Sequence, residues 1–303
     1  MKKRLLALAL CAAPTLALST PAEAARPAEV NAEQSAPVTL RLMLQRGLTR
    51  SYTFEGQLTR EGLEGTAGDV ANLEASLRYT FEVQSVADDG TVDIAASLTD
   101  PVMRYAVNEE EEGSDDLIAG VRDARLTVRA ATDGSLRERS GTIDTRTVNP
   151  DIGGFLQDAF NQVWIQFPQE PVAAGDSWMQ VVPLTLGTTA SGIEAVVNAR
   201  YTFAGFADVD GVNTAVIDVQ YATEIDGNMS VGAASRLLRV VGRGTGTGHI
   251  LFDPAQGVIT EMAVDNGSVL TATETNGRRS TQAVSSSASL TLDAPRPDED
   301  SGN

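Results

Sequence analysis

Two stretches of this sequence alternate between apolar and polar side chains, and this alternation constrains the fold more than any other feature. In residues 73–83 and 193–203 the odd-numbered positions are apolar or aromatic, and the even-numbered ones are mostly polar or charged. Successive side chains of a β-strand point to opposite faces, so each stretch is expected to be a strand with one buried face. Burial on one side is typical of antiparallel sheets. The sequence therefore predicts a mainly β, antiparallel fold.

Glycine-containing dipeptides lie between the strand-like runs and predict tight turns. Asp-Gly and Asn-Gly favour hairpins because glycine accepts a positive φ at no steric cost. We predict hairpin turns at four of them: Asp89-Gly90, Asp133-Gly134, Asp210-Gly211 and Asn276-Gly277.

The same landmarks suggest an internal duplication. The tetrapeptide Arg-Tyr-Thr-Phe occurs at 78–81 and again at 200–203, and the turns after each copy recur at nearly the same spacing. The spacing is far longer than that of solenoid or propeller repeats. We interpret the chain as two homologous, curved-sheet halves that resemble half-barrels, the first at residues 37–148 and the second at 169–293.

The segment between the halves, residues 149–168, is predicted to be an amphipathic helix with its linker. Asn149 and Pro150 supply a capping residue and a proline suited to the first helical turn, and Pro168 ends the helix. We expect either a linker helix that completes the core or a lid over an apolar cavity. In the second case the ligand-binding side chains are Phe155, Leu156, Phe160 and Trp164.

A second candidate ligand-binding feature is a strand with glycine at every second position. Such glycines share one strand face and leave it without side chains, so something must lie close against the bare backbone. We expect either the helix or a sharply coiled neighbouring strand to pack there, or the face to form the wall of a groove for an extended apolar ligand. The residues concerned are Gly242, Gly244, Gly246 and Gly248.

The beginning of the chain has the features of a cleavable export signal at residues 1–24. A cationic start is followed by an apolar run and by Ala22-Glu23-Ala24, which suits signal-peptidase cleavage. A lipoprotein signal ending at Cys11 fits less well, because Leu10 stands where a small residue is expected. We predict a periplasmic or extracellular protein with a flexible leader at 25–36 and a disordered acidic tail at 294–303.

The charge of the chain limits its partners. Lys and Arg number 23 against 41 Asp and Glu, for a net charge of −18, so nucleic acid is not an expected partner. Every basic residue after Lys3 other than His249 is Arg, which fits either genome composition or adaptation to salt. Aromatic residues make up 5% of the chain and its end is charged, so we do not expect an integral membrane protein.

The inventory of reactive side chains is poor. Cleavage after Ala24 removes the one Cys and both Lys residues, and the one His, His249, lies inside a strand-like run. No Gly-x-Ser-x-Gly motif is present, and the acidic run at 109–112 lacks the spacing of a calcium loop. We therefore predict no catalytic residues, no metal site and no cofactor, and we keep a carboxylate-only hydrolase as a third hypothesis.

Short motifs suggest a family. Pro171-Val172-Ala173-Ala174-Gly175-Asp176-Ser177-Trp178 and the turn at 253–257 resemble those of a family of exported bacterial β-rich proteins of unknown function. The opening at Gly47 fits less well, since its aromatic residue is delayed to Tyr52. The resemblance implies no activity. The architecture is more remotely similar to the half-barrels of periplasmic lipoprotein carriers.

Together these features predict a non-catalytic extracytoplasmic protein that binds an apolar small molecule, a lipid or a lipidated partner. The alternative is an envelope interaction or scaffold protein without a ligand cavity.

Overall fold

The computed structural model describes residues 30–31, 36–63, 70–108, 110–112, 125–140, 165–186, 193–231 and 236–293. All regular elements within these residues are strands. They are β1 (Thr49–Leu63), β2 (Ala71–Val86), β3 (Thr91–Val107), β4 (Glu110–Glu112), β5 (Arg125–Ala131), β6 (Leu136–Ser140), β7 (Ser177–Leu186), β8 (Ile193–Val209), β9 (Val212–Val231), β10 (Arg236–Asp253), β11 (Val258–Glu274) and β12 (Arg279–Leu292).

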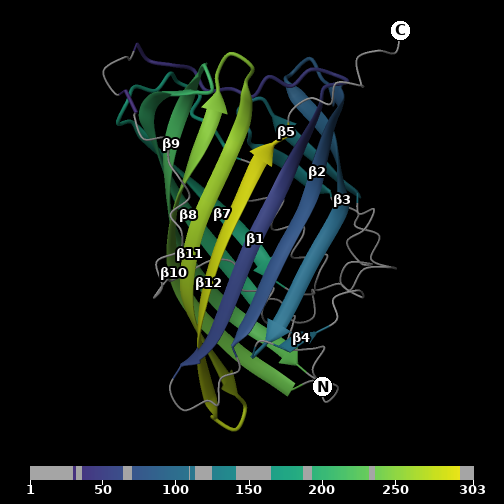
Figure 1. Cartoon of the computed structure of the whole chain (residues 1–303), viewed down its shortest axis with the longest axis vertical. Coiled ribbons are helices and arrows are strands. Elements are labelled where there is room, and N and C mark those ends of the chain that lie inside the picture. The colour runs from purple at the N-terminus through teal and green to yellow at the C-terminus, as the bar shows by residue number, and fades with distance from the viewer. Residues whose placement is uncertain are drawn as a thin grey trace.

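The strands form one open, antiparallel sheet in the order β6-β5-β3-β2-β1-β12-β11-β10-β9-β8-β7, with β4 paired to β3. Figure 1 shows this sheet as a strongly curved surface with β1 and β12 side by side. The prediction of a mainly β, antiparallel, curved-sheet fold is confirmed. The two predicted halves are not separate bodies, because β1 pairs with β12 along most of its length and joins them into a single sheet.

The alternation of side chains is what holds these strands in register. Every odd-numbered residue of β8 from Ile193 to Phe203 is buried, and five of the odd-numbered residues of β2 are buried as well. A shift by one residue would expose this whole apolar set, so the register is strongly specified. The strand predictions for 73–83 and 193–203 are therefore confirmed.

All four predicted hairpin turns are present. Each has its glycine at positive φ, from 78° at Gly90 to 84° at Gly277. In three of them the preceding Asp or Asn side chain accepts a backbone hydrogen bond, for example from Thr91 N–H to Asp89 Oδ1 at 2.9 Å. The side chain thus satisfies a backbone donor that the turn leaves unpaired.

Equivalent backbone contacts precede β1 and β7. Gly47 N–H donates to Val83 O at 2.9 Å, and Gly175 N–H donates to Phe203 O at 2.7 Å. Both glycines have positive φ. The two contacts are alike, but their residues are not offset by the spacing of the sequence repeats, and a common origin of the two halves stays a prediction.

Two extended segments, residues 36–48 and 165–172, connect the two arms of the sheet. One arm contains β1 to β6 and the other contains β7 to β12. Leu42 N–H donates to Thr132 O in the β5–β6 turn at 3.1 Å, and the next residue, Met43, donates to Gly257 O in the β10–β11 turn at 3.0 Å. Leu40 and Phe167 are buried in the main core, which draws on strands from both arms. These segments therefore close one end of the curved sheet.

Two predicted segments lie mostly outside the described residues. Of the predicted helix and linker, only residues 165–168 are described, and they form neither helix nor strand. Within the predicted leader, Asn31 forms a backbone bridge with Phe206 and so has a defined position on β8. In the part of the chain that the structure describes, no helix has the length and apolarity needed to cross a membrane.

Candidate binding cavity

An apolar cavity lies where the segment 36–48 meets the inner face of the sheet. Its volume, measured as the space open to the centre of a water molecule, is about 80 Å³. A single water needs roughly 10–15 Å³ on that measure, so the cavity has room for several. Its apolar walls come from β2, β3, β12 and both extended segments, and include Leu44, Leu48, Phe81, Ile94, Ile165 and Leu290.

The local sequence explains why these side chains converge. Even-numbered residues of β1 point to the inner face, which places Arg50 and Tyr52 there. The ring of Tyr52 packs edge-on against Phe81, with centroids 5.5 Å apart. The β10–β11 turn contributes Gln256, because Asp253 Oδ1 accepts the backbone N–H of Ala255 at 2.8 Å and that of Gln256 at 3.1 Å.

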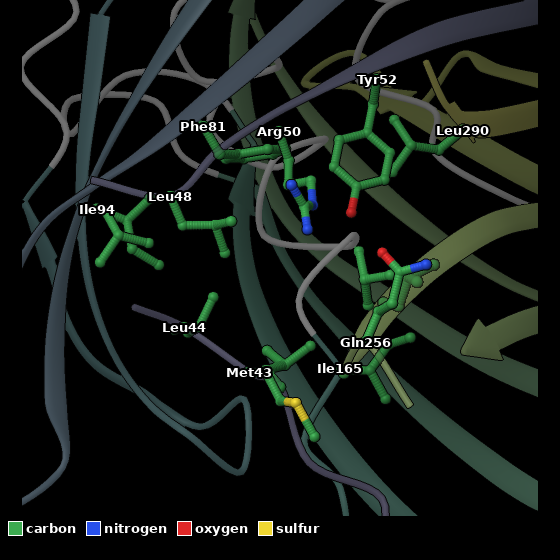
Figure 2. A pocket seen from close by; sticks show the side chains of 15 residues that line it. Met43, Leu44, Leu48, Arg50, Tyr52, Phe81, Ile94, Ile165, Gln256 and Leu290 are labelled. Carbon is green, nitrogen blue, oxygen red and sulfur yellow. The ribbon is translucent and has the colours of Figure 1, made fainter. Parts of the chain in front are cut away.

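Three polar groups share the cavity with these apolar walls. Figure 2 shows the guanidinium of Arg50, the hydroxyl of Tyr52 and the amide of Gln256 directed toward the same region. Burial raises the pKa of Tyr52 well above its ordinary value, against a smaller lowering by the charge of Arg50. Tyr52 is therefore a neutral hydroxyl, and Arg50 is the one charged group among the described residues that line the cavity.

The cavity extends from the surface into the core. Met43 is 49% exposed at its outer side, whereas Tyr52 and Leu290 are buried at its inner side. Concave, mostly apolar sites with a few convergent polar groups are the usual form of a small-molecule site. The arrangement can therefore hold an apolar group and offer hydrogen bonds and one positive charge to a polar atom attached to it.

The predicted glycine face lies elsewhere on β10, and none of its four glycines lines this cavity. A Cβ on Gly242 would collide with the side chain of Leu270, and one on Gly248 would collide with the carbonyl oxygen of Ala263. Both obstacles belong to β11, so the neighbouring strand packs against the bare face. Packing of β11 is thus enough to explain Gly242 and Gly248, and the groove-wall alternative stays a prediction. The other predicted binding residues, Phe155, Leu156, Phe160 and Trp164, lie outside the described residues.

Sequence reasoning missed Arg50, Tyr52 and Gln256 as binding residues. A signal for the first two was present, since they share the inward parity of β1 with apolar residues. Nothing in the sequence indicated that Gln256 would meet them.

His249 lies on the face of β10 opposite the glycines. It is buried, and its Nε2 is 3.3 Å from Glu261 Oε1 on β11. Within the described residues, no group of three or more His, Cys, Asp or Glu side chains is placed to hold a metal ion.

No protein-family model matches this chain, and no curated protein matches it. Among solved structures, one of lipid–protein interactions in lipovitellin is 11% identical, with a TM-score of 0.48, over 86% of this chain and 26% of that chain. The chain thus spans about a quarter of the lipovitellin chain.

Two bacterial structures are also similar. An outer membrane channel from Pseudomonas putida F1 is 8% identical, with a TM-score of 0.24, over 86% of this chain and 100% of that one. A protein from Bacteroides fragilis, described as exported and as having a YmcC-like fold, is 11% identical, with a TM-score of 0.21, over 82% and 98%. Because identities and TM-scores are low, these likenesses carry no functional inference. The chain is a mainly β protein with one open, curved antiparallel sheet.

Proposed function

We propose that this protein is a non-catalytic, extracytoplasmic binding protein for an apolar ligand, a lipid or the acyl group of a lipidated partner. The observation that supports the proposal is the apolar cavity with Arg50 beside it. The export signal predicted at residues 1–24 supports a location in the periplasm or outside the cell.

The size of the cavity limits what it takes. At about 80 Å³ it accepts a small apolar group or the end of an acyl chain, and not a whole lipid. The remainder of a long ligand would leave past Met43, which is half exposed. Burying each methylene of such a chain contributes about 0.8 kcal/mol, so a short segment suffices for measurable affinity.

The polar groups add selectivity. A site built to donate hydrogen bonds discriminates against analogues that lack the matching acceptor. Tyr52 and Arg50 both donate, so we expect preference for apolar molecules that carry an ester, hydroxyl or acid oxygen near the enclosed end.

The cavity can be tested by filling it. Leu44→Trp places a bulky ring in the cavity from a half-buried position, and Leu237→Trp makes the same change on an exposed face of β10. The protein purified from its native host is expected to carry a bound apolar molecule in native mass spectrometry. Binding of the neutral probe N-phenyl-1-naphthylamine is expected to weaken about tenfold in Leu44→Trp, a cost of about 1.4 kcal/mol, and to be unchanged in Leu237→Trp.

A ligand-free mass spectrum together with equal probe binding by both variants would refute the proposal. If Leu44→Trp does not fold, the milder Leu44→Phe in the same position serves as the filling variant.

One observation supports the alternative of an envelope interaction protein. β7 is the last strand at one end of the sheet, and its residues Met179 and Val181 are each 60% exposed. Apolar side chains on a terminal strand are typical of surfaces that contact another protein. This alternative predicts a stable partner on crosslinking in cells, lost on Val181→Glu. A protein that stays uncrosslinked would exclude it.

A further inference from the structure

A row of inward-facing side chains crosses five neighbouring strands at a distance from the cavity. The pairing registers place one residue of each strand directly opposite the next. In the order β1, β12, β11, β10, β9, the row is Arg60, Val284, Ser268, Gly244 and Thr223. Asn266 is the next inward residue of β11 and lies opposite Gly246.

The polar members of this row are buried, and each has one polar atom without a hydrogen-bond partner in the described structure. Arg60 is 4% exposed, Thr223 2%, Ser268 0% and Asn266 9%. One buried polar atom of each has no hydrogen-bond partner within the described structure: Arg60 Nη1, Thr223 Oγ1, Ser268 Oγ and Asn266 Oδ1. Each such atom carries a desolvation penalty, and native proteins seldom leave several together without a purpose or a bound group.

The charge of Arg60 is also uncompensated among these residues. No acidic residue occupies the inward positions next to the row, and the guanidinium has no ion pair with a described residue. A buried cation without a counter-charge is strongly unfavourable. The neighbouring inward positions are Leu58, Gly62, Ala71, Leu73, Tyr221, Ile225, Leu270, Gln282 and Ser286.

Most polar groups of the row can donate hydrogen bonds, so the row is suited to a ligand that carries a hydrogen-bond acceptor. The guanidinium and both hydroxyls donate hydrogen bonds, whereas the unpaired atom of Asn266 is an oxygen, which accepts them. The side chain of Asn266 lies over Gly246, where any Cβ would collide with it. The missing side chains on β10 therefore leave the donors of β9 and β11 facing one another.

We propose that this row binds the carboxylate of an apolar monocarboxylate such as a fatty acid. The planar carboxylate pairs with the guanidinium of Arg60 and accepts hydrogen bonds from Ser268 and Thr223. Leu270 and Val284 belong to an apolar cluster with Ile225 and Val240, and they contact the first part of the acyl chain. A carboxylate is favoured over a phosphate because it supplies the single negative charge that one guanidinium lacks.

This site is separate from the cavity of the proposed function. Tyr52 and Arg60 are on the same strand, and their Cα atoms are roughly 26 Å apart at the usual rise of a β-strand. The two proposals therefore succeed or fail independently.

The test compares two Arg→Met variants on the delipidated full-length mature protein. Arg60→Met removes the buried charge, and Arg243→Met makes the same change at an exposed position beside Gly244. Dodecanoate binding, measured by calorimetry, is expected to weaken at least tenfold in Arg60→Met and to stay unchanged in Arg243→Met. Neutral 1-dodecanol is expected to bind no more tightly to the wild type than to Arg60→Met. Dodecanoate labelled with 13C at its carboxyl carbon reports the ionisation of that group by NMR. The bound carboxylate is expected to stay ionised to a lower pH in the wild type than in Arg60→Met.

Equal dodecanoate binding by the wild type and Arg60→Met would overturn the proposal. A delipidated wild type that binds no dodecanoate would also overturn it, and would leave internal water as the partner of these polar groups. If Arg60→Met does not fold, Thr223→Val tests the same site and is expected to weaken binding severalfold. Leu44→Trp, which fills the cavity, is expected to leave dodecanoate binding at Arg60 intact.

Discussion

Replacing Gly248 by alanine tests whether the glycines of β10 exist for packing or for a ligand. A Cβ at this position would lie 2.8 Å from Val264 Cγ1 and 2.9 Å from Val264 Cα, and would collide with the carbonyl oxygen of Ala263. Two of these three atoms belong to the backbone of β11, so no change of rotamer relieves the overlap. The strands must separate locally to accept the methyl group.

The expected cost follows from two opposing effects. Overpacking typically costs about 1–3 kcal/mol, and the backbone contacts place Gly248→Ala near the upper end. Alanine also lowers the conformational entropy of the unfolded chain, which raises the free energy of unfolding by about 0.4–1 kcal/mol. The net loss of unfolding free energy is then about 2 kcal/mol, or roughly 4–8 °C in Tm for a domain of this size.

Urea unfolding followed by circular dichroism measures this loss, with Thr247→Ala as the matched control on the exposed face of the same strand. The control is expected to change stability by less than about 1 kcal/mol. A Gly248→Ala protein as stable as the control would refute the packing explanation. If that stable variant also lost binding of the apolar probe, the glycines would form a groove wall instead.

Three further predictions follow from the turns and the core. Gly134→Ala is expected to destabilise the fold by more than about 1 kcal/mol, because φ is 82° there and a Cβ would collide with the carbonyl oxygen of Ile165. A variant with the same Tm as the wild type would contradict this. Asp253→Ala is expected to cost about 1–3 kcal/mol in chemical unfolding, since it leaves the N–H groups of Ala255 and Gln256 unpaired, whereas Asp253→Asn should retain part of the stability. Burial raises the pKa of Tyr52, Tyr79 and Tyr201, so stability is expected to be complete below about pH 10 and to fall as pH rises above it. Tyrosinate absorbance should then appear together with unfolding, and ionisation of all tyrosines in a folded protein would exclude this.

The sequence by itself determined the fold class and the local geometry. Alternation in 73–83 and 193–203 predicted the strands and their buried faces, and Asp-Gly and Asn-Gly predicted the turns. These features depend on neighbours in the chain, so they are visible in a single sequence. The inward parity of Arg60 and Tyr52 was visible in the same way, although its consequence was not.

Only the tertiary structure decided how the pieces meet. The pairing of β1 with β12 brings Phe54 opposite Leu290. Nothing in the sequence of either strand indicates that the other is its partner. Interstrand hydrogen bonds join backbone groups that nearly every residue has, so periodicity reports which face is buried and not which strand lies beside it. The cavity has the same origin, since Leu44, Ile165 and Leu290 converge from distant parts of the chain only after the sheet has curved around them.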